Sequence, residues 1–376
     1  MDFSKVTNLI DTMPKRGIPF FHLIVTKDGH EVYNHLSGFS DEKLEKPLNR
    51  ENLYWLFSVS KIATCVCAMQ LVEKGLLKLD DPVSKYISSF AHLTIRDENG
   101  NAQPCDTVMT VKHLFTMTAG IGPDHESKEV LKDLLEGNAD TLSIIRRIAQ
   151  VPLYFTPGTS YKYSFCHDIL AAVVEIVSGI KFSSYVQQNL LSILDMNNTG
   201  FRPSKEQETR FCASYQYDNS NGTSKLVPTN NPFLLTEHYD SGGAGLFSCG
   251  DDYIKLLTAL ANGGKAPNGR QILSEKTIEQ FEVNHLSKEA LREFAGFRLH
   301  GYGWGLCGRT HINPDFSLSK SSVGEFGWDG AAGCFAMVDR KNKVAIFYGM
   351  QVYNCLYSYI VLEPLIRNLV FEALEK

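Results

Sequence analysis

Strand-like segments near both ends of the chain constrain its fold most. Residues 20–39 contain two apolar, partly alternating runs around the turn sequence Lys-Asp-Gly-His at 27–30. Residues 334–338 and 344–352 flank a second polar turn at 339–342. Both patterns predict β-hairpins. Helical spacing of apolar residues predicts helices at 62–77, 111–117, 142–150, 168–177, 182–194 and 362–374.

This order of elements predicts a single sheet assembled from distant parts of the chain. Strands that lie far apart in the sequence can pair in one layer, and the helices between them then form an insertion. We find no internal repeat and no low-complexity segment. The prediction is therefore one sheet built from the two ends, with a helical region inserted into it.

Bulk composition limits the classes of function. The chain has 376 residues, 43% of them hydrophobic, and can bury a large core. Its formal net charge of -5 gives no attraction to phosphate, so no nucleic-acid partner is expected. No uncharged apolar stretch approaches the roughly 20 residues that span a bilayer, so no membrane partner is expected. The first residues also lack the apolar core of a secretory signal.

Cysteine and histidine patterns give no sign of a metal. The nine cysteines are dispersed, with no Cys-x-x-Cys pair. This usage favours reduced thiols and predicts a cytoplasmic location. The eleven histidines form no His-Glu-x-x-His or similar spacing. We therefore predict neither a metal nor another cofactor.

Ser58 stands out among four serines that have a lysine three residues later. It alone follows an apolar run, residues 53–57, and precedes a long apolar helix. Residues three apart on a helix are neighbours, so Lys61 can reach the Ser58 hydroxyl. The free N–H groups of a first helical turn favour negative charge on oxygen. For this tetrad alone, a serine N-cap beside a solvated lysine is the commoner arrangement. The other three serines are Ser40, Ser178 and Ser317.

Further motifs make the chain resemble a known family. Residues 58–61 resemble the Ser-x-x-Lys of class C beta-lactamases, D,D-peptidases and family VIII carboxylesterases. Residues 155–164 resemble that family's Pro-Gly segment, which leads to its catalytic Tyr-Ser, here Tyr163 and Ser164. Three more segments match in order over nearly the whole chain. They are 114–121, with Met117 and Ala119 as departures, 241–246 with 251–253, and 327–333.

The resemblance implies the fold of beta-lactamases and transpeptidases. This is an α/β fold of the α+β type, with an antiparallel sheet flanked by helices and a mostly helical second domain. Residues 1–79 and 240–376 would form the discontinuous sheet domain, and residues 80–239 the helical domain. The active site would lie between the two.

The same resemblance implies roles for individual residues. Ser58 would be the nucleophile, and Lys61 and Tyr163 would share the proton that it loses. Because their titration would be coupled, the base is not assigned to one of them. The backbone N–H groups of Ser58 and Ala331 would form the oxyanion hole. Phe165, Trp328, Asp329 and Gly330 would contact the substrate.

Two departures from the family's motifs bear on the substrate. Beta-lactamases and peptidases have Tyr-x-Asn, whose amide binds an acylamino side chain, whereas this chain has Phe165. They also have Lys-Thr-Gly or His-Thr-Gly, which binds a carboxylate, whereas this chain has Trp328-Asp329-Gly330. A serine hydrolase of small carboxylic esters is therefore expected, with a small-molecule ester or amide as its substrate. Beta-lactamase, D,D-peptidase or D-aminopeptidase activity, acyl transfer to an alcohol, and a noncatalytic binding protein are the alternatives.

Several residues keep two interpretations. Asp329 could bind a cationic or hydroxyl-rich substrate, or be a solvated acid at a strand end. Asp168 follows His167 at a predicted helix start, where a helix-start role is the commoner one. The acyl chain, the acyl acceptor and the oligomeric state stay open. Six aromatic residues could line an apolar pocket or belong to the core: Tyr54, Trp55, Phe165, Tyr239, Trp304 and Trp328.

Overall fold

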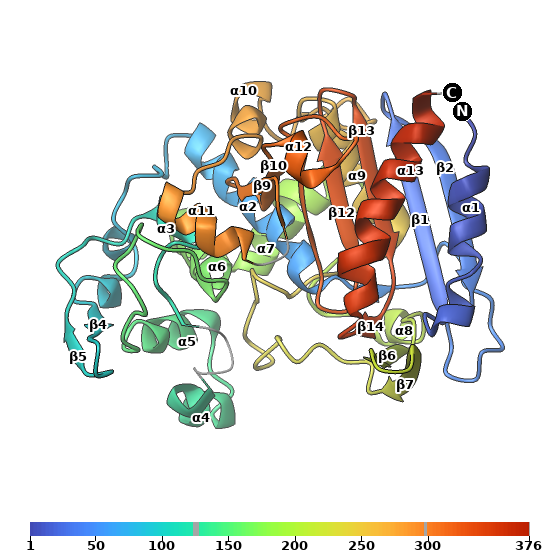
Figure 1. The fold of residues 1–376 in the computed structure, drawn as a ribbon. Coiled ribbons are helices and arrows are strands. Elements are labelled where there is room, and N and C mark those ends of the chain that lie inside the picture. Colours follow the sequence, from blue (N-terminus) through green and yellow to red (C-terminus); the bar gives the residue numbers. More distant parts are fainter. Residues whose placement is uncertain (123–127, 297–298, 376) are drawn as a thin grey trace.

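A seven-stranded antiparallel sheet forms the centre of the molecule (Figure 1). The computed structural model describes residues 1–122, 128–296 and 299–375. The strands follow the order β2-β1-β13-β12-β11-β10-β9 across the sheet. Their bounds are β1 Phe20–Lys27, β2 His30–Gly38, β9 Tyr302–Trp304, β10 Arg309–His311, β11 Phe326–Asp329, β12 Phe335–Asp339 and β13 Val344–Gly349.

The two ends of the chain meet between β1 and β13. Leu23 pairs with Tyr348 in this antiparallel register, which confirms the sheet predicted from distant strands. The β1–β2 hairpin turns at Asp28 and Gly29, whose φ angles are 52° and 84°. Asp-Gly adopts this left-handed backbone with little strain, which is why the dipeptide marks a hairpin in the sequence.

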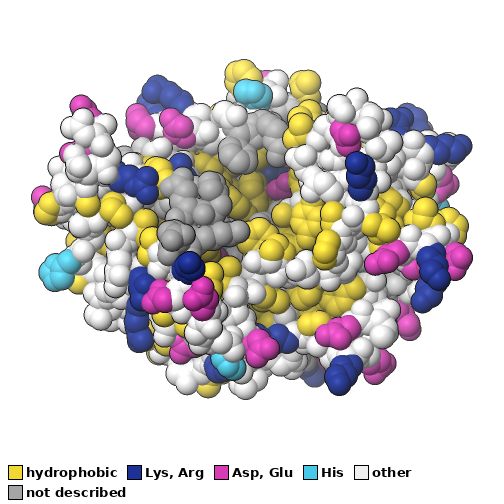
Figure 2. Space-filling view, turned by 90° about the horizontal axis from the view of Figure 1, so that it is seen from below, with side chains coloured by type: hydrophobic (Ala, Val, Ile, Leu, Met, Phe, Trp, Pro, Cys, Tyr) yellow, Lys and Arg dark blue, Asp and Glu magenta, His cyan; other side chains and the backbone are white. Residues whose placement is uncertain are grey.

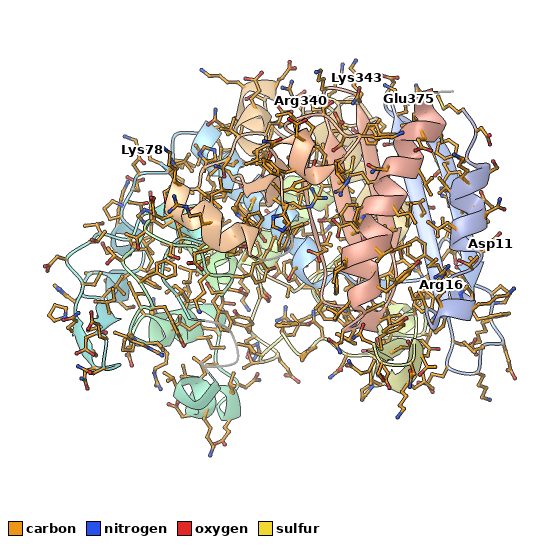
Figure 3. The ribbon with its side chains drawn as sticks, viewed as in Figure 1. Asp11, Arg16, Lys78, Arg340, Lys343 and Glu375 are labelled. Atoms are coloured by element: carbon orange, nitrogen blue, oxygen red, sulfur yellow. The ribbon has the colours of Figure 1, made fainter. Side chains whose placement is uncertain are left out.

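Ion pairs fix the predicted turn between β12 and β13. Arg340 lies in this turn and pairs with Glu275 at 2.6 Å and with Glu282 at 2.7 Å. Figure 3 shows Arg340 and Lys343 at the same end of the molecule as Glu375, the last residue of the C-terminal helix. The second hairpin is thus tied to the segment before β9.

Helices cover both faces of the sheet (Figure 1). On one face α1 packs beside α13, and on the other α9 places Tyr253 against Phe347, with ring centroids 5.6 Å apart. Successive strand residues point to opposite faces, so Tyr348 lies in the α13 layer, near Ser358. The sheet is therefore buried from both sides. The helix bounds are α1 Ser4–Ile10, α9 Gly250–Ala261 and α13 Glu363–Glu375.

The helices of the middle of the chain gather at the β9 end of the sheet (Figure 1). At their centre α2 packs against α6, and every residue of α2 from 60 to 71 is buried. The predicted helices at 62–77, 111–117, 142–150 and 168–177 are confirmed within a few residues, whereas the one at 182–194 is split into α7 and a π-helical turn, Gln187–Leu191. The bounds are α2 Ser60–Glu73, α3 Val111–Phe115, α4 Lys128–Glu136, α5 Thr141–Ile148, α6 Cys166–Ser178 and α7 Phe182–Val186.

Short strands and helices complete the fold. In the described residues β3 pairs with β8, β4 with β5, and β6 with both β14 and β7. Strands β4 to β7 lie within residues 80–239, so this region is not wholly helical. Their bounds are β3 Tyr54–Trp55, β4 Thr94–Arg96, β5 Ala102–Pro104, β6 Ser214–Asp218, β7 Thr223–Val227, β8 Phe247–Ser248 and β14 Val352–Tyr353. The remaining helices are α8 Lys205–Glu208, α10 Glu275–Ile278, α11 Lys288–Ala295 and α12 Pro314–Ser317.

Length and apolar composition would let no single described helix cross a membrane. Among the described helices, one pair of segments, Cys166–Ser178 and Phe182–Leu191, is long and apolar enough when the two are taken together, but they meet at a bend of 77°. The first nine residues of α6 are buried inside the protein, as expected for a core helix.

Candidate active site

Ser58 lies at the junction between the β3 strand and helix α2. It is the middle residue of a 3-10 turn, Phe57–Val59, and α2 begins at Ser60. Phe57 has a φ of 47°, a backbone conformation that costs a bulky residue free energy and is tolerated when packing fixes it. Its ring packs against Phe233, with centroids 5.9 Å apart. The turn thus presents Ser58, which is only partly buried, at the N-terminal end of a buried helix.

Lys61 is held beside Ser58 by two hydrogen bonds. Its Nζ donates to Ser58 Oγ at 3.2 Å and to the carbonyl oxygen of Gly243 at 2.7 Å. Only 4% of the residue is exposed. The amine therefore points at the Ser58 hydroxyl from within the protein, which a solvated surface lysine would not do.

Tyr163 completes the group. Lys61 Nζ lies 4.6 Å from the centre of its ring, and Trp328 Nε1 donates to its phenol oxygen at 2.9 Å. Burial raises the pKa of Tyr163 above its usual value, while the charge of Lys61 and hydrogen bonds to Lys61, Ser58 and Trp328 oppose that rise. Ser58 and Lys61 from one segment and Tyr163 from a distant one thus form one contiguous polar network.

The end of β11 approaches Ser58 through glycine. A Cβ atom at Gly330 would lie 2.4 Å from the carbonyl oxygen of Leu56, so no side chain fits between this strand end and the turn that carries Ser58. Trp328 and Asp329 precede Gly330 in β11, and Ala331 follows it. In the described chain, no hydrogen bond to a protein acceptor is donated by the backbone N–H of Ser58 or Ala331. This leaves both N–H groups available for the predicted oxyanion hole.

A cavity of about 590 Å³ opens beside these residues. Figure 2 shows apolar side chains around a hollow in this face of the molecule. Ser58, Lys61 and Tyr163 line the cavity, and so do Ala331 and the four residues expected to contact the substrate: Phe165, Trp328, Asp329 and Gly330. Of the aromatic residues with two interpretations, Phe165 and Trp328 line the cavity, while Tyr54, Trp55, Tyr239 and Trp304 lie in the core.

The other Ser-x-x-Lys serines lie outside this cavity lining. The Ser40 hydroxyl donates to the carbonyl oxygen of Lys46, the Ser178 hydroxyl to those of Glu175 and Ile180, and Ser317 bonds His311. Each is engaged in local structure at a turn or a helix end. Only Ser58 combines the lysine, the helix start and a cavity.

Asp168 is the main site residue whose place the sequence pattern did not show. It lies in the first turn of α6, as a helix-start residue should, but its carboxylate accepts hydrogen bonds from Tyr239 at 2.8 Å and Ser241 at 2.7 Å. Burial raises the pKa of Asp168, and the nearby positive charge of Lys61 opposes the rise. The sequence shows only that Asp168 follows Tyr163 by five residues. Its hydrogen-bond partners, Tyr239 and Ser241, come from a distant segment and could not be predicted.

The 241–243 loop joins Asp168 to Lys61. A Cβ atom at Gly243 would lie 2.4 Å from an Asp168 carboxylate oxygen and 3.4 Å from Lys61 Nζ. The carbonyl oxygen of Gly242 accepts a hydrogen bond from Thr64 of α2 at 2.6 Å. The two glycines thus let the loop pass between α2 and α6 and bring its carbonyl groups to Lys61 and its helix.

A buried ionic group reaches the cavity through Arg309 and Glu363. Arg309, only 1% exposed, pairs with Glu325 at 2.6 Å and with Glu363 at 3.5 Å. Burial raises the pKa of Glu363 to about 7, Arg309 opposes this, and Asp329 adds to it. The charge of Arg309 is therefore compensated within the protein and is a poor substitute for the missing carboxylate-binding cation. Sequence patterns gave no signal for this group.

Metal ligands and disulfides are not part of the described site. No three His, Cys, Asp or Glu side chains within the described residues are grouped as a metal site requires. All nine cysteines are free thiols, and all but Cys105 are buried. The polar side chains that line the cavity carry hydroxyl, amine, phenol, indole, carboxyl and guanidinium groups.

Comparison with solved structures finds the same fold in other proteins. EstCE1, described as a hydrolase with promiscuous acyltransferase activity, has a TM-score of 0.81 and 22% identity, covering 98% of both chains. Unliganded simvastatin synthase (LovD) from Aspergillus terreus has a TM-score of 0.83 and 18% identity, covering 99% of this chain and 98% of its own. These two structures show the shared fold.

Sequence comparison covers most of the same length. The chain is 28% identical over 352 residues to Esterase EstB from Burkholderia gladioli, covering 86% of this chain and 83% of the relative. A model of the Beta-lactamase family matches residues 6–354. With the antiparallel sheet, the helical insertion and the motifs in their expected order, the chain belongs to the beta-lactamase family.

Proposed function

We propose that this protein is a serine hydrolase that cleaves neutral carboxylic esters through an acyl-Ser58 intermediate. The observation that carries the proposal is the hydrogen bond from Lys61 Nζ to Ser58 Oγ at 3.2 Å, with the Tyr163 ring against the same amine. A hydroxyl, a buried amine and a phenol in contact can pass a proton among themselves, which activates a serine at neutral pH.

The first half of the reaction forms the acyl enzyme. Ser58 Oγ attacks the ester carbonyl carbon while its proton passes to the Lys61–Tyr163 pair. The negative charge on the carbonyl oxygen is bound by the backbone N–H groups of Ser58 and Ala331. The bond to the alcohol oxygen then breaks, and the pair returns the proton to the leaving alcohol.

The second half releases the acid. Water enters where the alcohol left, gives a proton to the same pair and attacks the acyl carbon. The ester bond to Ser58 breaks, its oxygen regains the proton, and the carboxylic acid leaves. Acyl transfer to an alcohol is the same step with an alcohol in place of water. The acyltransferase activity named for EstCE1 favours it as a second candidate.

The charges around the cavity favour a neutral substrate. Asp329 and Glu363 line it, and the charge of Arg309 is paired with Glu325 and Glu363. An anionic beta-lactam or peptide carboxylate would meet these acids without the cation or the asparagine amide that other family members use. We therefore rank beta-lactamase, D,D-peptidase and D-aminopeptidase activity below ester hydrolysis. The esterase named as EstB supports this order.

A division into two domains and a cytoplasmic location also belong to the proposal. We propose that residues 1–79 with 240–376, and residues 80–239, are two domains whose boundary carries the site, since Ser58 comes from one part and Tyr163 from the other. A cytoplasmic location is supported by nine free thiols.

A labelling experiment tests the proposed nucleophile. A fluorophosphonate probe should attach to Ser58, as located by mass spectrometry, and Ser58→Ala should lose both labelling and p-nitrophenyl acetate turnover at an unchanged melting temperature. The matched control is Ser178→Ala, which removes another serine with lysine three residues later and should keep both. Unlabelled Ser58 in folded protein would overturn the proposal, and faster turnover of a chromogenic cephalosporin than of butyrate esters would reverse the substrate order.

A further inference from the structure

A large part of the cavity lining consists of apolar side chains, which we call the apolar wall. They come from α4 and from the segment before the 241–243 loop, together with Phe165. The residues of this wall are Leu131, Leu135, Phe165, Pro232, Phe233 and Leu235. Figure 2 shows apolar side chains gathered at this hollow. Because exposed apolar surface in a cavity is unfavourable in water, such a wall indicates an apolar ligand.

The cavity is much larger than a short ester needs. Its volume is about 590 Å³, while a water molecule occupies about 30 Å³ in the liquid, so the cavity has space for roughly 20 groups of that size. An acetyl ester would leave most of that space to water in contact with leucine and phenylalanine side chains. A longer apolar group would displace this water and gain binding energy.

The apolar wall is anchored in place. Arg147 of α5 binds the Asp133 carboxylate of α4 through two hydrogen bonds of 2.9 and 3.0 Å, and it also donates to the carbonyl oxygen of Val130 at 3.1 Å. Leu131 is 2% exposed, whereas Val130, the neighbouring residue, is 36% exposed. The helix therefore turns Leu131 toward the cavity and Val130 toward solvent.

We propose that the substrate is an ester in which the acyl or the alcohol part is an extended apolar group of roughly six to twelve carbons, lying against α4 and residues 232–235. This inference rests on the proposed function, because it places that group relative to Ser58. Arg309, Asp329 and Glu363 also line the cavity, and they would face the smaller and more polar part of the ester.

A chain-length series tests the proposal. Two series of esters, one varied in the acyl part and one in the alcohol part, extend from two to ten carbons. We expect kcat/KM to rise about threefold to fourfold for each added methylene over at least four methylenes in one series. Flat or falling values in both series would overturn the inference. Ser58-dependent turnover of acetate would still stand, so the two failures are distinguishable.

Paired variants of α4 locate the group. Leu135→Trp should fill part of the cavity and shift the best chain length down by at least two carbons. Val130→Trp adds the same side chain on the exposed side of the helix and should leave the chain-length profile unchanged. If Leu135→Trp changed all chain lengths by one common factor, the apolar group would lie elsewhere, and the proposal would fail.

Tyr359, which also lines the cavity, contacts the segment of the predicted oxyanion hole. The phenol oxygen of Tyr359 lies 2.9 Å from the carbonyl oxygen of Gly330 and 3.0 Å from that of Ala331, and its single O–H group is shared between these two acceptors. The Gly330 carbonyl and the Ala331 N–H belong to one peptide unit, so a bond to this oxygen fixes the direction of that N–H and strengthens it as a donor. We infer that Tyr359 is a positioning residue for the oxyanion hole, which also rests on the proposed function.

The expected effect is confined to the transition state. Tyr359→Phe should lower kcat about tenfold, leave KM within about twofold, and weaken a boronic acid inhibitor by the same factor as kcat. Tyr353→Phe is the control, because its hydroxyl donates to a backbone carbonyl, that of Asn230, in another segment. A raised KM with unchanged kcat, or no change at all in a protein with Ser58-dependent activity, would overturn this inference.

Discussion

The indole of Trp328 donates a hydrogen bond to the phenol oxygen of Tyr163 at 2.9 Å. This bond stabilises the phenolate, and it opposes the rise of the Tyr163 pKa that burial causes. A hydrogen bond to a charged group is worth about 1.5–3 kcal/mol. In Trp328→Phe we therefore expect kcat/KM at pH 7 to fall at least tenfold and the acid limb of its pH profile to move to higher pH.

Trp304→Phe is the control for this variant. The Nε1 of Trp304 donates to the carbonyl oxygen of Phe115 at 2.9 Å, and this side chain is fully buried. It should lower the melting temperature without moving the acid limb. An unmoved limb in Trp328→Phe would contradict a phenolate base and assign the base to Lys61.

Removal of the Asp168 charge should move the acid limb of the kcat/KM pH profile to lower pH. Asp168 is 5% exposed, and its charge interacts with that of Lys61. A negative charge favours the more protonated form of the Lys61–Tyr163 pair, whichever member loses the proton. In Asp168→Asn we expect the acid limb of kcat/KM to move down by about one pH unit.

The matched control is Asp252→Asn, another buried carboxylate, which pairs with Lys255 at 2.8 Å. Both variants should unfold at a lower temperature, because each disturbs a buried hydrogen-bond network. Only the Asp168 variant should change the pH profile. A shift in both, or in neither, would show that Asp168 has a structural role alone.

Gly243→Ala should damage the site without a change of charge. The added Cβ would lie 2.4 Å from the Asp168 carboxylate and 3.4 Å from Lys61 Nζ, and overpacking of this kind costs about 1–3 kcal/mol. We expect kcat/KM to fall by about 100-fold or more. In Gly200→Ala the new Cβ meets only the Phe247 ring at 3.4 Å, so near-normal kinetics are expected there. Equal kinetics for the two variants would contradict the assigned role of the loop.

His22 should make stability depend on pH. Burial lowers its pKa to about 4, with opposing effects from Asn34 and Asp251. The unfolded chain takes up this proton below about pH 6.5 and the folded chain only near pH 4, so stability is lost as pH falls through that range. We expect the free energy of unfolding to fall about 3 kcal/mol more between pH 7 and 4 than in His22→Asn. Chemical denaturation at several pH values measures the difference, and parallel curves would contradict it.

Local patterns in the sequence determined the elements and the family. Asp28 and Gly29 mark a left-handed turn because few other residue pairs adopt it without strain. The apolar run before Ser58 and the apolar helix after Lys61 distinguish this tetrad from three others in the same chain. These are properties of residues a few positions apart, so the strands, the main helices and the nucleophile candidate could be predicted.

Only the tertiary structure decided which distant groups share an environment. Asp168 looks like an ordinary helix-start residue until α6 packs on α2 and brings it near Lys61. Arg309 and Glu363 form an ion pair, and Tyr359 binds the peptide after Gly330, through contacts between segments far apart in sequence. The size and apolar wall of the cavity likewise come from α4, the 232–235 segment and β11 together. Burial and charge interactions depend on distances in space, and the order of residues alone does not specify them.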